Sequence, residues 1–246
     1  MRLTRYMLST AALCIAGMVV FFFASKPAYV EPPIPRPAHE TSTPNYKESL
    51  ARLEAERLRL ASRYQHASST ERAAIIAEAR TVATRSIYDD LFPAWYGTPW
   101  DFNGTSEIPQ QGKIACGYFV STILRDAGLK VKRVRLAQQA SENIILSLTT
   151  NPFVKRFRRA PIDDFVNAVK QWGPGIYIVG LDIHVGFIVN TGDEVYFIHS
   201  SYVEPYAVVK EKAIESKILA SSNYRVLGNV FADDLFIQNW LTQTRF

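Results

Sequence analysis

The sequence contains very little cysteine, with only Cys14 and Cys116 among its 246 residues. Cys14 lies in an apolar N-terminal run, so the remainder of the chain cannot form an internal disulfide bond. The sequence also has no CxxC pair and no closely spaced HxxH pair, and this absence argues against a structural zinc site. Cys116 is therefore an unpaired thiol, for which catalysis and simple burial are the two explanations.

The chain also lacks a concentration of charge of one sign. Its formal net charge is +5 and its pI is about 9.2, but the basic residues are scattered and no basic stripe is interleaved with aromatic residues. Nucleic acid is therefore not an expected partner. The charge balance indicates only a mild attraction to anionic surfaces, such as lipid headgroups or cell-wall polymer.

Residues 7–24 are uncharged and almost entirely apolar, and they follow Arg2 and Arg5. The run has about the minimum length that crosses a bilayer. The small residues that signal peptidase requires are poorly placed after it, so a signal anchor over residues 1–25 is favoured over a cleaved signal peptide that would release a secreted protein. Because arginines remain in the cytoplasm, the rest of the chain is expected in the periplasm or the cell exterior.

Residues 26–44 are rich in proline and predict an extended linker. Helical spacing of apolar residues follows in residues 45–65, at Tyr46, Leu50, Leu53, Leu60 and Tyr64. Arg57 occupies the remaining position on this face. A helix packed on its own domain is favoured over a weak coiled coil. Ser68 and Glu71 predict a capping box that opens a second helix, which is expected to end before Pro93. Residues 45–92 are thus expected to form a helical segment.

Residues 93–246 are expected to form a single domain. A loop enters a helix between residues 112 and 128, and further helices are expected over residues 136–148 and 161–172. Between these two helices, the basic residues at 155–159 are interpreted as a solvated loop. The alternative is that they bind carboxylates of a cell-wall peptide. Residues 176–181, 184–190 and 194–199 read as strands. Helices that precede an antiparallel sheet indicate an α+β fold.

Cys116 is expected at the start of its helix, where free N–H groups and the helix dipole favour a thiolate and lower the pKa of the thiol. His184 would take the thiol proton, and His199 would hold the His184 ring. A two-residue turn at Thr191-Gly192 would place the two histidines directly opposite each other, on the face that looks toward Cys116. Gly186 would leave room there for the cysteine helix. A zinc site made by Cys116 and both histidines is the alternative.

The stretches YGTPWDFNGTS (residues 96–106) and IACGYFVSTILRDAGL (residues 114–129), followed by HVGFIVN and the histidine of VYFIHSS, resemble the ordered motifs of NlpC-type papain-like cysteine hydrolases. The resemblance covers about residues 95–201. It implies a papain-like α+β catalytic domain over residues 93–246 and hydrolysis of peptide amides in peptidoglycan. It also implies Cys116 as the nucleophile, His184 as the base and His199 as the orienting residue. No cofactor and no metal are expected.

The chain departs from this family beside the nucleophile. Cell-wall members usually carry Asp-Cys-Ser, whereas Ala115 and Gly117 flank Cys116 here. Because these two residues cannot hold a stem-peptide amine, we expect little dependence on such an amine. Trp100 stands where tyrosine is more usual, and Trp100 and Asp101 are the candidate substrate-binding residues, with core packing as the alternative for Trp100. A thiol-dependent acyltransferase and a catalytically idle binding or scaffold module are the alternative functions.

Overall fold

The computed structural model describes residues 45–246. All of these residues belong to one compact unit. The expected signal anchor (residues 1–25) and proline-rich linker (residues 26–44) lie outside the described residues. Within residues 45–246, no helix has the length and the apolar composition needed to span a bilayer.

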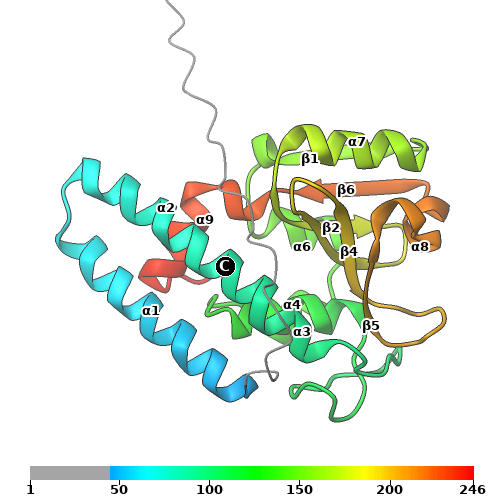
Figure 1. The fold of residues 1–246 in the computed structure, drawn as a ribbon, viewed down its shortest axis with the longest axis horizontal. Coiled ribbons are helices and arrows are strands. Elements are labelled where there is room, and N and C mark those ends of the chain that lie inside the picture. Colours follow the sequence, from blue (N-terminus) through cyan, green and yellow to red (C-terminus); the bar gives the residue numbers. More distant parts are fainter. Residues whose placement is uncertain (1–44) are drawn as a thin grey trace, which may run out of the picture. The chain divides into compact units, whose positions relative to one another are not determined.

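A six-stranded antiparallel sheet lies at the centre of the fold, with strand order β1-β6-β2-β3-β4-β5 (Figure 1). The strands are β1 (Val154–Arg158), β2 (Gly175–Leu181), β3 (Val185–Asn190), β4 (Val195–Ser200), β5 (Val208–Lys212) and β6 (Tyr224–Gly228). Every residue of β2 and β3 is buried, which accounts for their nearly continuous apolar sequences. The expected α+β class is confirmed.

Helices cover both faces of this sheet, because side chains alternate along each strand and both sets are apolar. One face carries Tyr177, Val179 and Phe197, and the helices α7 (Ile162–Trp172) and α8 (Lys217–Ser221) pack against it. The other face carries Ile178, Phe187 and Ile198. Its covering helices are α4 (Cys116–Asp126), α6 (Ser141–Leu146) and α9 (Asp234–Thr242).

The predicted helical segment joins the core of the domain. Helices α1 (Tyr46–His66) and α2 (Ser69–Ser86) lie side by side as an antiparallel pair (Figure 1). Leu53 and Leu60 belong to the same apolar cluster as α4 and α9. Arg57, only 5% exposed, donates hydrogen bonds to Glu54 and to the carbonyl of Leu241 in α9. The helical pair therefore packs on its own domain.

The start of α2 was predicted correctly, and the helix ends at Ser86, before Pro93 as predicted. Ser68 accepts a hydrogen bond from the Glu71 N–H, and Glu71 accepts one from the Ser68 N–H, so the capping box is present. A π-helical turn (Ile87–Leu91), which the sequence did not predict, follows α2 and leads into α3 (Phe92–Trp95). Pro93 lies in the first turn of α3, where a helix does not need its N–H.

Two sequence predictions were wrong between residues 133 and 159. The single helix expected over residues 136–148 is divided into α5 (Arg133–Ala137) and α6, because Ala140 adopts an extended conformation with ψ of 143°. The basic residues interpreted as a loop form the edge strand β1, which pairs with β6. Arg156 donates to Glu142 at 2.7 Å. Charged side chains at a sheet edge protect it from further strand pairing.

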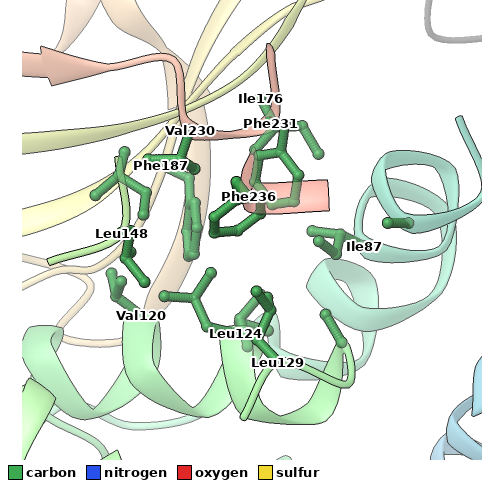
Figure 2. Packing of buried hydrophobic residues seen from close by; sticks show 14 of the residues in the cluster. Ile87, Val120, Leu124, Leu129, Leu148, Ile176, Phe187, Val230, Phe231 and Phe236 are labelled. Carbon is green, nitrogen blue, oxygen red and sulfur yellow. The ribbon is translucent and has the colours of Figure 1, made fainter. Parts of the chain in front are cut away.

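The packing of α4 on the sheet determines where its first residue lies. Phe187 of β3 is surrounded by apolar side chains from α4 and from the C-terminal elements, including Val120, Leu124 and Phe236 (Figure 2). The Phe187 ring also contacts Phe119, with ring centroids 6.0 Å apart. These contacts hold α4 across β3, with its N-terminus near the end of the strand where His184 is found.

Candidate active site

Cys116 is the first residue of α4, and hydrogen bonds fix the segment that precedes it. The Ala115 N–H donates to the carbonyl of Gly104 at 2.9 Å, and the Ser200 hydroxyl donates to the carbonyl of Ile114 at 2.7 Å. Gly104 is required for this approach, because a Cβ at this position would lie 2.6 Å from the Ile114 nitrogen. The nucleophile candidate is thus held from both the loop and the sheet.

Cys116 is half-buried, and its sulfur lies against backbone N–H groups. Burial raises the pKa of the thiol, whereas N–H groups of Val185, Gly117 and Cys116 itself point at the sulfur and lower the pKa, with the smaller effect. The prediction of a thiol with a lowered pKa was therefore wrong, because burial disfavours the thiolate more than these dipoles stabilise it. In the free protein, Cys116 is a neutral thiol at pH 7.

His184 precedes β3, in the tight turn after β2, where its carbonyl accepts a hydrogen bond from the Leu181 N–H at 2.8 Å. His184 is only 3% exposed, and its Nε2 atom lies 2.9 Å from Nδ1 of His199. Burial, followed by the proximity of His199, holds the pKa of His184 well below its usual value. His184 is therefore an uncharged base at pH 7.

His199 lies behind His184 and is fixed on two sides. Its ring is stacked on Phe197, with centroids 3.9 Å apart, and its Nε2 atom lies 3.2 Å from Oε1 of Glu211 on β5. Burial lowers the pKa of His199, and Glu211 partly opposes this effect. For Glu211 itself burial raises the pKa, but hydrogen bonds from His199 and Ser216 together hold it below the usual value, so its side chain is a carboxylate.

The carboxylate determines which ring nitrogens carry protons. A carboxylate only accepts hydrogen bonds, so Nε2 of His199 must carry the proton and Nδ1 of the neutral ring must be an acceptor. His184 then donates from Nε2 to this acceptor, and its own Nδ1 is left unprotonated. That nitrogen is the atom that can take a proton from a thiol. Glu211 thus selects, through His199, the basic tautomer of His184.

The predicted register of the two histidine strands was wrong, and so was the prediction that their shared face looks toward Cys116, because His184 and His199 lie on the face of Phe197, opposite α4. Asn190 pairs with Val195, and not with Asp193, so residues 191–194 form a longer connection closed by the hydrogen bond from Thr191 N–H to the Glu194 carbonyl. The register differs by two residues from the predicted one. Because side chains alternate with a period of two, His184 and His199 remain on one face as diagonal neighbours.

The role predicted for Gly186 was also wrong. His199 shares the sheet face of Phe197, whereas α4 packs on the face of Phe187. A Cβ at Gly186 would lie 2.7 Å from the Phe197 ring and 2.8 Å from Cβ of His199, so this glycine accommodates the stacked rings and not the cysteine helix. Cys116 approaches His184 around the end of β3, where its sulfur meets the Val185 N–H.

A cavity of about 780 Å³ opens between these elements, and Cys116, His184 and Trp100 all line it. The Trp100 N–H donates to the carbonyl of Tyr206 at 2.7 Å. Tyr202, which the sequence did not single out, also lines the cavity, and its ring centroid lies 5.1 Å from that of His184. The structure therefore brings the nucleophile candidate, the base candidate and Trp100 to one space.

Asp101, the other candidate substrate-binding residue, lies outside this cavity. It lines a neighbouring depression with Lys113, and its carboxylate accepts hydrogen bonds from the Lys113 ammonium at 3.1 Å and from the Asn103 N–H at 2.9 Å. Asp101 therefore shapes the turn that follows Trp100.

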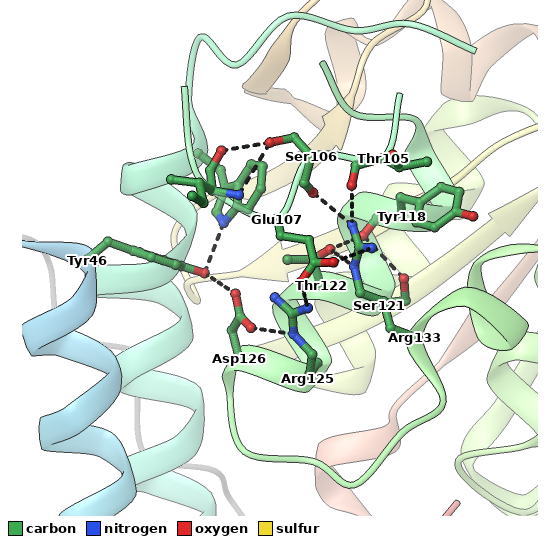
Figure 3. A network of polar contacts seen from close by, with 12 residues as sticks. Tyr46, Thr105, Ser106, Glu107, Tyr118, Ser121, Thr122, Arg125, Asp126 and Arg133 are labelled. Carbon is green, nitrogen blue, oxygen red and sulfur yellow. Dashed lines mark hydrogen bonds and ion pairs between the residues drawn. The ribbon is translucent and has the colours of Figure 1, made fainter. Parts of the chain in front are cut away.

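Figure 3 shows the buried Arg133 side chain in contact with α4 and with the loop of residues 105–106. Arg133 of α5 donates to the hydroxyl of Thr122 in α4 at 2.8 Å and to the carbonyl of Thr105 at 2.9 Å. Gly117 permits the close approach of α5, because a Cβ there would clash with the carbonyl oxygen of Ala137. Packing thus explains Gly117, one of the two residues beside Cys116 that differ from the NlpC-type pattern.

Among residues 45–246, no three His, Cys, Asp or Glu side chains are grouped so that they could hold a metal ion. The alternative zinc site made by Cys116 and the two histidines has no such grouping to support it. No protein-family model, no curated protein and no solved structure matches this chain. The function of the chain must therefore be inferred from the geometry of the candidate site and from its sequence motifs.

Proposed function

We propose that this protein is a cysteine hydrolase with a papain-like catalytic domain, held by an N-terminal anchor on the outer side of the cytoplasmic membrane, that cleaves amide bonds of the cell envelope. One observation carries the proposal: Cys116, at the N-terminus of a helix, shares a cavity with His184, whose tautomer is set by His199 and Glu211. A half-buried thiol with only a packing role would not require a buried histidine pair at the same cavity.

The reaction begins with Cys116 as a neutral thiol and His184 as a neutral imidazole. As the Cys116 sulfur forms a bond to the carbonyl carbon of the substrate, Nδ1 of His184 takes the thiol proton. The bond to the amine then breaks, and the amine leaves with the proton that His184 received. Water attacks the resulting thioester with His184 as base, which releases the carboxylic acid and restores the thiol. His199 positions the base, and Glu211 stabilises the positive charge that develops on the two rings.

The carbonyl oxygen gains negative charge during both steps and needs hydrogen-bond donors. The backbone N–H groups of Cys116 and Gly117 belong to the first turn of α4, where helices leave such groups free. They already point at the sulfur and so lie next to the bond that forms. Fixed donors of this kind stabilise the oxyanion without reorganisation.

The test uses the full chain and its two cysteines. Purified peptidoglycan and, separately, a lipid extract of the envelope are incubated with the unmodified protein, with Cys116→Ala and with Cys14→Ala, and the products are analysed by mass spectrometry. We expect a product with a new carboxyl group from the unmodified protein and from Cys14→Ala, and none from Cys116→Ala. A product that persists in Cys116→Ala would overturn the proposal.

The resemblance to NlpC-type enzymes implies peptidoglycan as the substrate. The residues that line the cavity bear directly on that implication, because they determine which acyl groups can lie beside Cys116.

A further inference from the structure

The cavity beside Cys116 has an uncharged lining. In the part of the chain that the structure describes, no Asp, Glu, Lys or Arg side chain lines it. Its polar side chains, such as Asn103, Thr105 and Gln138, are neutral and offer no opposite charge. Peptidoglycan stem peptides carry free amino and carboxyl groups, and a charged group is disfavoured where it leaves water without an ion-pair partner. The lining therefore disfavours a charged acyl group next to the nucleophile.

Two exposed apolar side chains stand at this cavity. Phe102 is 80% exposed and Ile183 is 78% exposed, the highest values among the large exposed apolar residues of the described chain, and both line the cavity. They come from separate turns, one following Trp100 and one preceding His184. Exposed apolar side chains that cluster at a cavity mark a surface that binds something apolar.

Hydrogen bonds hold both turns in shape, so the exposure does not come from a loose chain. The turn of Phe102 is closed by the Gly104 N–H, which donates to the Asp101 carbonyl at 2.9 Å. The turn of Ile183 is closed by the Leu181 N–H, which donates to the His184 carbonyl at 2.8 Å. The backbone thus presents each apolar side chain to the cavity.

We propose that this cavity binds the alkyl chain of a fatty acyl group, so that the substrate is an amide or ester of a fatty acid. This inference rests on the proposed function of Cys116 and His184. The Cys116 sulfur takes the fatty acyl group as a thioester, the amine or alcohol leaves with the thiol proton, and water then releases the fatty acid. The volume of about 780 Å³ lies within the range of roughly 300–1,000 Å³ that is usual for ligand pockets.

The test measures kcat/KM of the full chain for p-nitrophenyl esters with butanoyl, hexanoyl and octanoyl groups. Each buried methylene contributes a factor of up to about 4, so we expect kcat/KM to increase steadily with chain length. Two charged esters of comparable length, 6-aminohexanoyl and adipoyl, serve as comparisons, and each should be at least about tenfold poorer than the hexanoyl ester.

Three variants test which residues cause the increase of kcat/KM with acyl chain length. Phe102→Ser and Ile183→Ser should each make this increase smaller. The matched control is Leu235→Ser, which removes a side chain that is 54% exposed on α9 and does not line the cavity, and it should leave the increase unchanged. Turnover that depends on Cys116 but does not increase with chain length, or that favours a charged ester, would overturn the fatty acyl site and leave the thiol mechanism intact.

A binding measurement separates the site from catalysis. Calorimetry with the full-length Cys116→Ala variant compares octanoate with butanoate, and we expect octanoate to bind at least about tenfold more tightly. Equal affinity, or no binding of octanoate, would contradict the proposed site. Ester turnover that survives in Cys116→Ala would instead contradict the proposed function.

Discussion

Replacement of Glu211 by glutamine tests whether the carboxylate acts on His184 through His199. The glutamine oxygen can still accept the hydrogen bond from His199, so the change removes mainly the negative charge. A hydrogen bond to a charged group contributes about 1–1.5 kcal/mol more than a neutral one, so kcat/KM at its plateau should decrease roughly 5- to 15-fold. Because Glu211 raises the pKa of His199, its loss should lower the pKa of the histidine pair.

The pH dependence of kcat/KM distinguishes this role from a structural one. The acid limb reports protonation of the histidines in the free enzyme, so in Glu211→Gln it should move to lower pH. A variant that merely loosened the site would admit water and move the limb to higher pH, toward the usual histidine value. The control is Glu194→Gln, whose carboxylate pairs with Lys212 at 3.3 Å, and its profile should not change. An acid limb that stays in place or rises in Glu211→Gln would refute the reasoning.

Stability, thiol reactivity, packing and membrane attachment provide four further tests. Below pH ~6.5 the free energy of unfolding should decrease by up to about 1.4 kcal/mol per pH unit for each of His184 and His199, because their pKa values are lowered in the folded state and the unfolded chain binds the protons first. Urea titrations between pH 7 and 5 measure this decrease. If the dependence of the unfolding free energy on pH were the same in His184→Gln, the prediction would be contradicted. Iodoacetamide should alkylate Cys116 at pH 7 more slowly than it alkylates free cysteine, because the pKa of the Cys116 thiol is raised. Faster alkylation would instead support the lowered pKa that was predicted from the sequence. Gly117→Ser should lower the free energy of unfolding by roughly 1–3 kcal/mol through the clash with the Ala137 carbonyl, and unaltered stability in chemical denaturation would exclude the clash. The full chain should sediment with membranes and resist carbonate extraction, whereas a mature N-terminus between residues 25 and 31 would indicate signal cleavage.

Three of the four interior strands, β2 to β4, were predicted from sequence, whereas the interior strand β6 and the two edge strands were not. β2 to β4 are rich in Ile, Val and Phe because both of their faces are buried. β1 and β5 have the sequences VKRFR and VVKEK. Their side chains are charged because an edge is partly solvated, and such sequences resemble loops. Since β5 was not expected, nothing distinguished Glu211 from its neighbours Lys210 and Lys212.

The histidine pairing illustrates a different limit. A register shift of two residues between β3 and β4 leaves every side chain on the same face of the sheet. His184 and His199 therefore still share a face, although the predicted pairing of the two strands was two residues away from the observed one. The exact partner of each histidine depends on the turn, which Thr191 and Glu194 close through their backbone. Sequence patterns indicate turns well but determine their length poorly.

The pKa of Cys116 could not be obtained from sequence because two effects oppose each other. The position at the start of α4 was predicted and is observed. How deeply the sulfur is buried depends on the loop of residues 96–106 and on α5, neither of which the helix itself specifies. Burial outweighs the N–H groups here, so in the proposed mechanism His184 takes the thiol proton during the attack on the substrate and not before it.

A covalent acyl-enzyme on Cys116 is the most direct test of the proposed chemistry. The full chain is mixed with p-nitrophenyl octanoate, quenched with acid within the first turnover, digested with trypsin and analysed by mass spectrometry. We expect one octanoyl group on the tryptic peptide of residues 114–125, which contains Cys116, and no such adduct in Cys116→Ala. Release of p-nitrophenol by the unmodified protein without that adduct, or with the acyl group on another residue, would contradict the role of Cys116 as nucleophile.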